Sequence, residues 1–270
     1  MKLAHCTDIH LDHLSESRTR EFFRSVLTLE PDAIVSTGDM SIARLLETHL
    51  DWMQAETRAV PIYFVLGNHD FYGSSIATIR ASIGRRTGRA VYLTTAEHPV
   101  SLGDGIAIIG HDGWYDGGYS DWFASRINMT DYNAIAEFRS HSRDEWFALI
   151  QHLADEAAQA ITTRAREAAK TSAAHVIIAT HVPPFATCSR APTREQSDGD
   201  WLPVMSSKRV GDAIRAVAEE FPAVRFTVLC GHTHTPWRER LTVNLECIVG
   251  DADTTGTSGY GHPMWSLLDV

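Results

Sequence analysis

The chain has 270 residues, 44% hydrophobic and 21% charged, so its composition is that of a globular protein long enough to fold without a disulfide or metal staple. Its 24 basic and 34 acidic side chains give a formal net charge of −10, which argues against a surface that tracks nucleic acid or docks on an anionic membrane. No uncharged apolar run approaches the ~18–20 residues of a membrane span, and the N-terminus lacks a signal-peptide pattern.

Short apolar segments bounded by polar residues or glycine predict strands. The first six of these segments are nearly continuously hydrophobic, so we expect strands covered on both faces. Extended patterning returns after about residue 241. The strand candidates are 3–6, 33–36, 61–66, 106–109, 176–179 and 226–230, followed by 241–245, 247–249 and 264–268.

Apolar side chains at helical spacing predict helices between these strands. They cover 42–53, with Ser41 as the N-cap, then 133–170 and 210–221. Alternating strands and helices predict an α/β layered fold, here in one domain over 1–270. Residues 112–131 gather aromatic side chains among Gly, Asp and Ser, which is typical of a long irregular loop with a functional role.

The cysteines are scattered and form no Cys-x-x-Cys motif. We therefore expect buried free thiols in a reduced compartment, which predicts a cytoplasmic protein. The four are Cys6, Cys188, Cys230 and Cys247.

Polar clusters follow five of the predicted strands. In open α/β sheets, ligands bind outside the carboxyl ends of the strands, so we expect these clusters to converge at one edge. The clusters are Asp8-Ile9-His10, Gly38-Asp39, Gly67-Asn68-His69-Asp70, His181 and Gly231-His232-Thr233-His234.

The clusters offer oxygen and nitrogen donors without thiolates, a set that suits borderline divalent metals. In extended backbone, donors two residues apart point to the same face, and glycine permits the sharp turns after the strands. A single catalytic zinc takes about three protein ligands, whereas a larger set with a shared carboxylate fits two ions about 3.5–4 Å apart. The donors are Asp8, His10, Asp39, Asn68, His181, His232 and His234.

Together and in this order, the five motifs resemble those of the calcineurin-like metallophosphoesterase superfamily, over about residues 1–250. The resemblance implies a four-layer α/β/β/α sandwich with an inserted cap-like loop and helix at about 112–170, which would shape substrate access. It implies a metal-dependent hydrolase that cleaves a small phosphoester through attack by a metal-bridging hydroxide. Two divalent or trivalent ions are implied, with Mn, Fe and Zn all compatible with the donors.

The resemblance also implies a role for each matching residue. Asp8, His10 and His234 would hold the first ion, Asn68, His181 and His232 the second, and Asp39 would bridge both. His69 would be the catalytic imidazole, donating a proton to the leaving group, and Asp70 would orient it.

The sequence departs from the family pattern after Asp39, where Met40-Ser41-Ile42-Ala43 replaces the further acidic or amide residue of many members. The segment His181-Val182-Pro183-Pro184 resembles the version common in phosphodiesterase-like members, which keeps a cyclic-nucleotide phosphodiesterase open as an alternative. A nuclease of the same superfamily and a non-catalytic scaffold are two further alternatives. The −10 charge argues against the nuclease, and the complete ligand set argues against the scaffold.

Substrate contacts are predicted at positions outside the five motifs. His111, aromatic residues of the 112–131 loop and two arginines after His181 are candidates, although aromatic loops more often pack on themselves and arginines are more often solvated surface charges. The candidates are His111, Trp114, Tyr115, Arg190 and Arg194.

Overall fold

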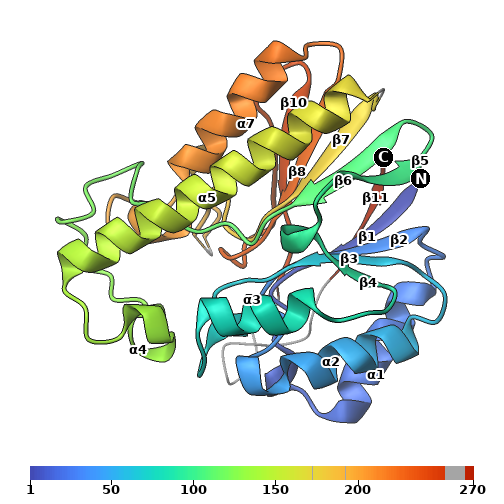
Figure 1. Cartoon of the computed structure of the whole chain (residues 1–270), viewed down its shortest axis with the longest axis horizontal. Coiled ribbons are helices and arrows are strands. Elements are labelled where there is room, and N and C mark those ends of the chain that lie inside the picture. Colours follow the sequence, from blue (N-terminus) through green and yellow to red (C-terminus); the bar gives the residue numbers. More distant parts are fainter. Residues whose placement is uncertain (172, 192, 253–264) are drawn as a thin grey trace.

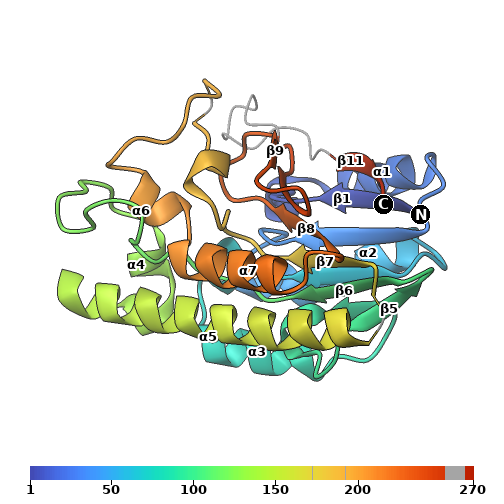
Figure 2. The ribbon, with the colours of Figure 1, turned by 90° about the horizontal axis from the view of Figure 1, so that it is seen from above.

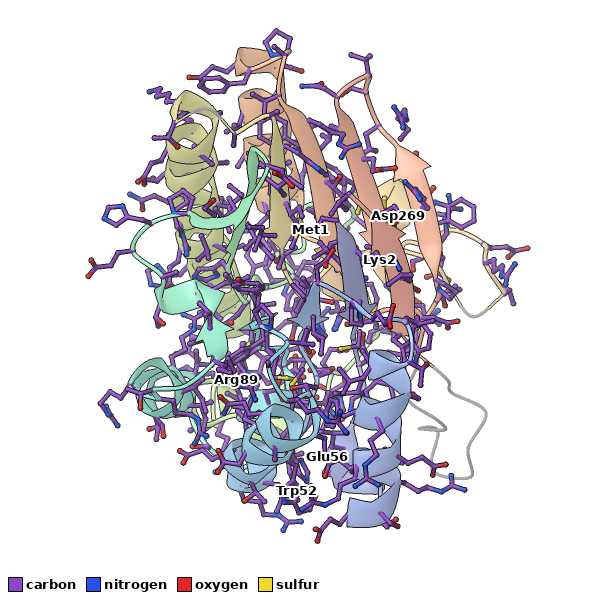
Figure 3. The ribbon with its side chains drawn as sticks, turned by 90° about the vertical axis from the view of Figure 1, so that its right-hand side faces the viewer. Met1, Lys2, Trp52, Glu56, Arg89 and Asp269 are labelled. Atoms are coloured by element: carbon purple, nitrogen blue, oxygen red, sulfur yellow. The ribbon has the colours of Figure 1, made fainter. Side chains whose placement is uncertain are left out.

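Two β-sheets lie face to face in the computed structural model, which describes residues 1–171, 173–191, 193–252 and 265–270 (Figure 1). The first sheet has the order β11-β1-β2-β3-β4, with β11 antiparallel to β1 and the others parallel. Figure 3, which labels Lys2 and Asp269, shows β1 and β11 side by side. The strands are β1 (Lys2–Cys6), β2 (Ala33–Thr37), β3 (Ile62–Val65), β4 (Ala90–Tyr92) and β11 (Trp265–Asp269).

The second sheet has the order β5-β6-β7-β8-β10-β9. Its four central strands are parallel, and both edge strands run antiparallel to their neighbours. The strands are β5 (Val100–Gly103), β6 (Ile106–Gly110), β7 (His175–Ala179), β8 (Arg225–Cys230), β9 (Trp237–Arg240) and β10 (Leu245–Val249).

Helices cover both outer faces of the sheet pair. On the first sheet lie α1 (Glu16–Leu27), α2 (Ala43–Glu56) and α3 (Ile76–Gly84), and on the second lie α5 (Arg143–Lys170) and α7 (Lys208–Glu220). Figure 2 shows α5 and α7 side by side. Two short helices, α4 (Asp131–Ala134) and α6 (Leu202–Met205), belong to the connecting segments.

The strand side chains alternate between two apolar layers, which confirms that both faces of the central strands are covered. Leu3 of β1 and Ile177 of β7 pack in the core between the sheets. Their neighbours Ala4 and Val176 face the outer helices instead. The predicted four-layer α/β/β/α architecture is therefore confirmed.

The helix predicted over 133–170 begins only at Arg143. Ser142 caps it in a capping box with Glu145, in which each side chain accepts a hydrogen bond from the other residue's backbone N–H. Ahead of this cap the chain forms α4 and a short 3₁₀ turn, Ala136–Phe138. The second half of α5 packs on the second sheet as an outer layer, so only the first part of the 112–170 insertion is loop.

Two smaller expectations were wrong. Ser41 does not cap α2: the N-cap is Ile42, and the Ser41 hydroxyl lies 2.7 Å from His49 Nδ1. Residues 241–244 form a turn between β9 and β10, where Val243 is 85% exposed. The strands β4, β5 and β9 had no sequence prediction; all three are short and lie at sheet edges. Strand β11 overlaps the predicted 264–268 segment over residues 265–268 and ends at Asp269, and residue 264 is outside the described residues.

Among the described residues, none of the helices combines the length and apolarity needed to cross a bilayer.

Candidate metal centre

The five polar clusters meet at the carboxyl ends of the central strands. Backbone hydrogen bonds join one cluster to the next: Asp8 N–H donates to Gly38 O at 3.0 Å, and Gly231 N–H donates to His181 O at 2.9 Å. A third bond runs from His10 N–H to Asp39 O at 3.0 Å. The strand order therefore brings the five clusters together at one edge, as predicted.

The ionisable donors form two groups that share one carboxylate. In each group, one potential ligand atom per residue lies within 4.8 Å of the others. The first group is Asp8, His10, Asp39 and His234, and the second is Asp39, His181 and His232. The amide oxygen of Asn68 lies 3.1 Å from His181 Nε2, beside the second group.

The backbone at the ligand positions is not extended, contrary to the sequence prediction. Five of these residues have positive φ, a left-handed conformation that is uncommon for residues other than glycine and is often found at functional sites. The φ angles are 49° at Asp8, 40° at His10, 51° at Asp39, 68° at His232 and 54° at His234.

Of the three glycines predicted to allow turns, only Gly38 has positive φ, at 97°. The other two permit close approach of the ligand loops. A Cβ at Gly67 would lie 2.2 Å from Asp39 Oδ1, and one at Gly231 would lie 1.8 Å from Thr7 Oγ1. Glycine is therefore needed at these two positions for space.

Backbone carbonyls orient two of the imidazoles. His181 Nδ1 lies 2.8 Å from Thr37 O, and His232 Nε2 lies 2.9 Å from Val204 O. Because a carbonyl only accepts, each of these ring nitrogens carries the proton, and the other nitrogen turns its lone pair toward the donor cluster in the neutral ring. This is the arrangement typical of metal-binding histidines.

Two buried carboxylates give the centre its negative charge. Burial opposes ionisation, but the neighbouring imidazoles, His234 for Asp8 and His181 for Asp39, hold both pKa values below their usual range. Burial likewise opposes the charged form of His181, yet Asp39 raises its pKa to about 10. The metal-free centre therefore holds protons where cations would bind.

His69 borders both the donor cluster and open space. Its backbone N–H donates to Asp39 Oδ1 at 2.8 Å, and its Nε2 lies 4.0 Å from Asp39 Oδ2. The ring stacks on Tyr72, with centroids 4.3 Å apart. Its side chain is 20% exposed, so the ring is accessible from the adjoining pocket.

Asp70 has a different role from the predicted one. Its two carboxylate oxygens accept hydrogen bonds from Ser41 N–H at 2.8 Å and Gly67 N–H at 2.9 Å. The side chain is fully buried, and it fixes the turn that carries Asn68 and His69. Asp70 thus acts on the loop backbone, since its oxygens are engaged there.

A pocket of about 430 Å³ opens beside the two donor groups. Arg190 contributes to its wall, with its guanidinium 3.9 Å from the ring centre of Trp237 and 4.0 Å from Glu239. Arg194 is exposed and does not line this pocket. The lining residues are Asp39, Asn68, His69, Met129, Arg190, Ala191, Ser197, Trp201, Met205, His232, Thr233 and His234.

Three predicted substrate contacts are core residues instead. Trp114 and Tyr115 are 2% and 0% exposed, and Trp114 stacks on Phe138 at 5.7 Å. His111 is 2% exposed, and its Nδ1 accepts a hydrogen bond from Gly113 N–H at 3.1 Å. Trp114 and Tyr115 therefore fit the alternative interpretation, in which the aromatic loop packs on itself.

The buried His111 leads to a pH prediction. Burial lowers its pKa to about 4, against 6.5 unperturbed, so the folded state favours the neutral ring. This contribution to stability is complete above pH 6.5 and is lost as the pH falls toward 4, with about 2 kcal/mol gone at pH 5. His111→Gln, which can still accept from Gly113, should show a smaller loss of urea stability between pH 7.5 and pH 5. An equal loss in both proteins, compared in the same metal state, would contradict the prediction.

The sequence analysis did not predict four residues of the pocket wall. Met129 comes from the predicted insertion, but Ala191, Ser197, Trp201 and Met205 come from a segment after β7 that drew no prediction beyond its arginines. Their residue types carry no chemical signature, and only the exposed Trp201 is unusual, at 43%. Asp131, which contacts Asn68, was also missed.

Comparisons with known proteins agree with this geometry. The family model described as calcineurin-like phosphoesterase matches residues 1–236. A crystal structure of a dimetal phosphatase from Danio rerio is similar, with a TM-score of 0.61 at 15% identity over 99% of this chain and 91% of that one. A purple acid phosphatase from yellow lupin (Lupinus luteus) has a TM-score of 0.52 at 11% identity, covering 98% of this chain and 45% of that one.

Among curated proteins, a transmembrane protein with metallophosphoesterase domain from Bos taurus is 35% identical over 80 residues. That match covers 28% of this chain and 18% of the bovine protein. The family match extends over most of the chain and includes all five motifs. The chain therefore belongs to the calcineurin-like phosphoesterase family.

Proposed function

We propose that the protein is a dinuclear metal-dependent hydrolase of a small phosphoester. The observation that carries this proposal is the position of Asp39, whose carboxylate belongs to both donor groups. Asp8, His10 and His234 would complete the first metal site, and Asn68, His181 and His232 the second. Oxygen and nitrogen donors around buried carboxylates fit Mn, Fe or Zn ions.

When bound, two such ions would lower the pKa of a coordinated water and neutralise phosphate charge. The chain's own residues then position the ester. His69 lies between the donor cluster and the pocket, where its imidazole would donate a proton to the leaving oxygen. Met129, Trp201 and Met205 would exclude water around the leaving group.

The pocket supports a small substrate over a nucleic-acid strand. Its volume of about 430 Å³ is in the range of small-molecule sites. Arg190 is the single Arg or Lys among its described lining residues, whereas a nucleic-acid backbone requires clustered cations. A phosphodiester that carries an apolar or aromatic group, such as the base of a cyclic nucleotide, fits this lining as well as a monoester does.

The test is metal analysis of the purified protein, followed by phosphoester assays with the metals found. We expect two ions per chain and metal-dependent turnover. Comparing bis-p-nitrophenyl phosphate with p-nitrophenyl phosphate separates diester from monoester preference. Full metal occupancy without turnover on a broad panel of esters would favour the non-catalytic scaffold.

We also propose that the protein works in a reducing compartment such as the cytoplasm. This proposal rests on the four cysteines, all of which are buried and free.

A further inference from the structure

A fully buried carboxylate from the insertion lies directly behind the metal centre. Asp131, the first residue of α4, is 0% exposed. Its Oδ1 accepts hydrogen bonds from Tyr72 Oη at 2.6 Å and from Asn68 Nδ2 at 2.9 Å. Its Oδ2 accepts from Tyr115 Oη at 2.8 Å. Because a buried carboxylate without donors is very costly, these three bonds make the position specific for an acceptor.

The contacts of Asp131 determine which way the Asn68 amide points. The Asn68 amide nitrogen Nδ2 donates to Asp131 Oδ1 at 2.9 Å and lies 3.1 Å from Tyr72 Oη, on the same side of the amide. A flipped amide would place its oxygen against the carboxylate, where it has nothing to accept. The amide oxygen is therefore held on the opposite side, 3.1 Å from His181 Nε2.

The same carboxylate holds the ring beneath His69. Tyr72 has one hydroxyl proton, which it donates to Asp131, so its oxygen is free to accept from Asn68. The Tyr72 ring stacks on His69 at an angle of 28°. Asp131 thus connects two residues of the 67–70 loop that differ in chemistry, an amide donor and an imidazole.

We propose that Asp131 is a positioning residue that orients Asn68 as a ligand of the second metal ion. The inference rests on the proposed function for the assignment of Asn68 as a ligand. It gives the insertion a role behind the metal centre, in addition to the pocket wall that Met129 supplies.

Asp131→Ala removes both acceptor oxygens, so the Asn68 amide and the Tyr72 hydroxyl lose their carboxylate partner. Titration calorimetry of the metal-free protein with Mn²⁺ should then show about 10–100-fold weaker binding of the second ion. Binding of the first ion should be unchanged, since the proposed function assigns Asn68 to the second ion alone.

Asp116→Ala is the matched control. Asp116 is also 0% exposed and lies in the same insertion, but it accepts from Gly118 N–H and Arg209 N–H, away from the ligands. This variant should lose thermal stability and keep both Mn²⁺ affinities. Tyr115→Phe, which removes only the donor to Oδ2, should leave the second ion's affinity near that of the wild type.

If Asp131→Ala does not fold, Tyr72→Phe provides a second test, because it removes one acceptor of the Asn68 amide and keeps the ring on His69. Weaker binding of the second ion alone supports the inference. Unchanged affinity in the variants, or equal weakening of both ions, overturns it, as does a wild-type protein that binds one ion. A wild type that binds two ions but hydrolyses no ester refutes the proposed function and leaves this inference intact.

Discussion

Asp39→Ala should remove both metal ions and reduce hydrolysis by about 10⁴-fold or more, since a coordinated water loses its lowered pKa. The physical reason is the shared carboxylate, which belongs to both donor groups and lies 3.4 Å from His181 Nε2. Without it, neither group keeps enough negative charge to bind a cation tightly. Elemental analysis of the purified variant measures the occupancy directly.

The control for this variant is Asp51→Ala on α2. Asp51 has a 64% exposed side chain that pairs with Arg86 on the surface, so both ions and full activity should remain. Full metal occupancy in Asp39→Ala would refute the bridging assignment. Loss of only one ion would assign Asp39 to a single site.

His69→Ala should keep both ions and lose about 10²–10⁴-fold in rate, the usual contribution of a general acid. The loss should be largest for esters with poor leaving groups, because these depend most on protonation of the departing oxygen. A series of aryl phosphoesters with graded leaving-group pKa measures this dependence, together with metal analysis of the variant.

His98→Ala serves as the matched control, because its side chain is 76% exposed and pairs with Glu167 on the surface. It should retain wild-type rates throughout the ester series. An equal loss for all leaving groups in His69→Ala would argue against the acid role. Loss of metal would show that the imidazole supports the centre itself.

The layered fold was predictable because its signals are local. Continuous apolar runs such as 176–179 indicate strands buried on both faces, and polar residues that follow them must then lie at the sheet edge. The strands β4 and β5 were not predicted because they are short, and β4 pairs only at the edge of the first sheet. The start of α5 was misplaced because residues 133–141 have helical residue types, whereas the capping box that begins the helix is formed by Ser142 and Glu145.

The sequence predicted the candidate metal ligands, but it did not predict the residues that surround them. His232 and His234 follow a strand and a glycine, so their place at the edge depends on local sequence. Asp131 lies 63 residues from Asn68, and only the packing of the insertion brings them together. Arg190 and Arg194 have the same chemistry in sequence, and the stacking of Arg190 on Trp237 is the difference that the fold adds.

The backbone hydrogen bonds between neighbouring ligand loops have a consequence for metal exchange. Each of the bonds from Asp8 to Gly38, His10 to Asp39 and Gly231 to His181 involves main-chain atoms alone, so none depends on an ion. The donors are therefore preorganised, and metal binding does not have to overcome the conformational entropy of ordering these loops. Ions should load and leave without refolding the edge of the sheets, and the metal that the protein carries should follow the supply in its surroundings.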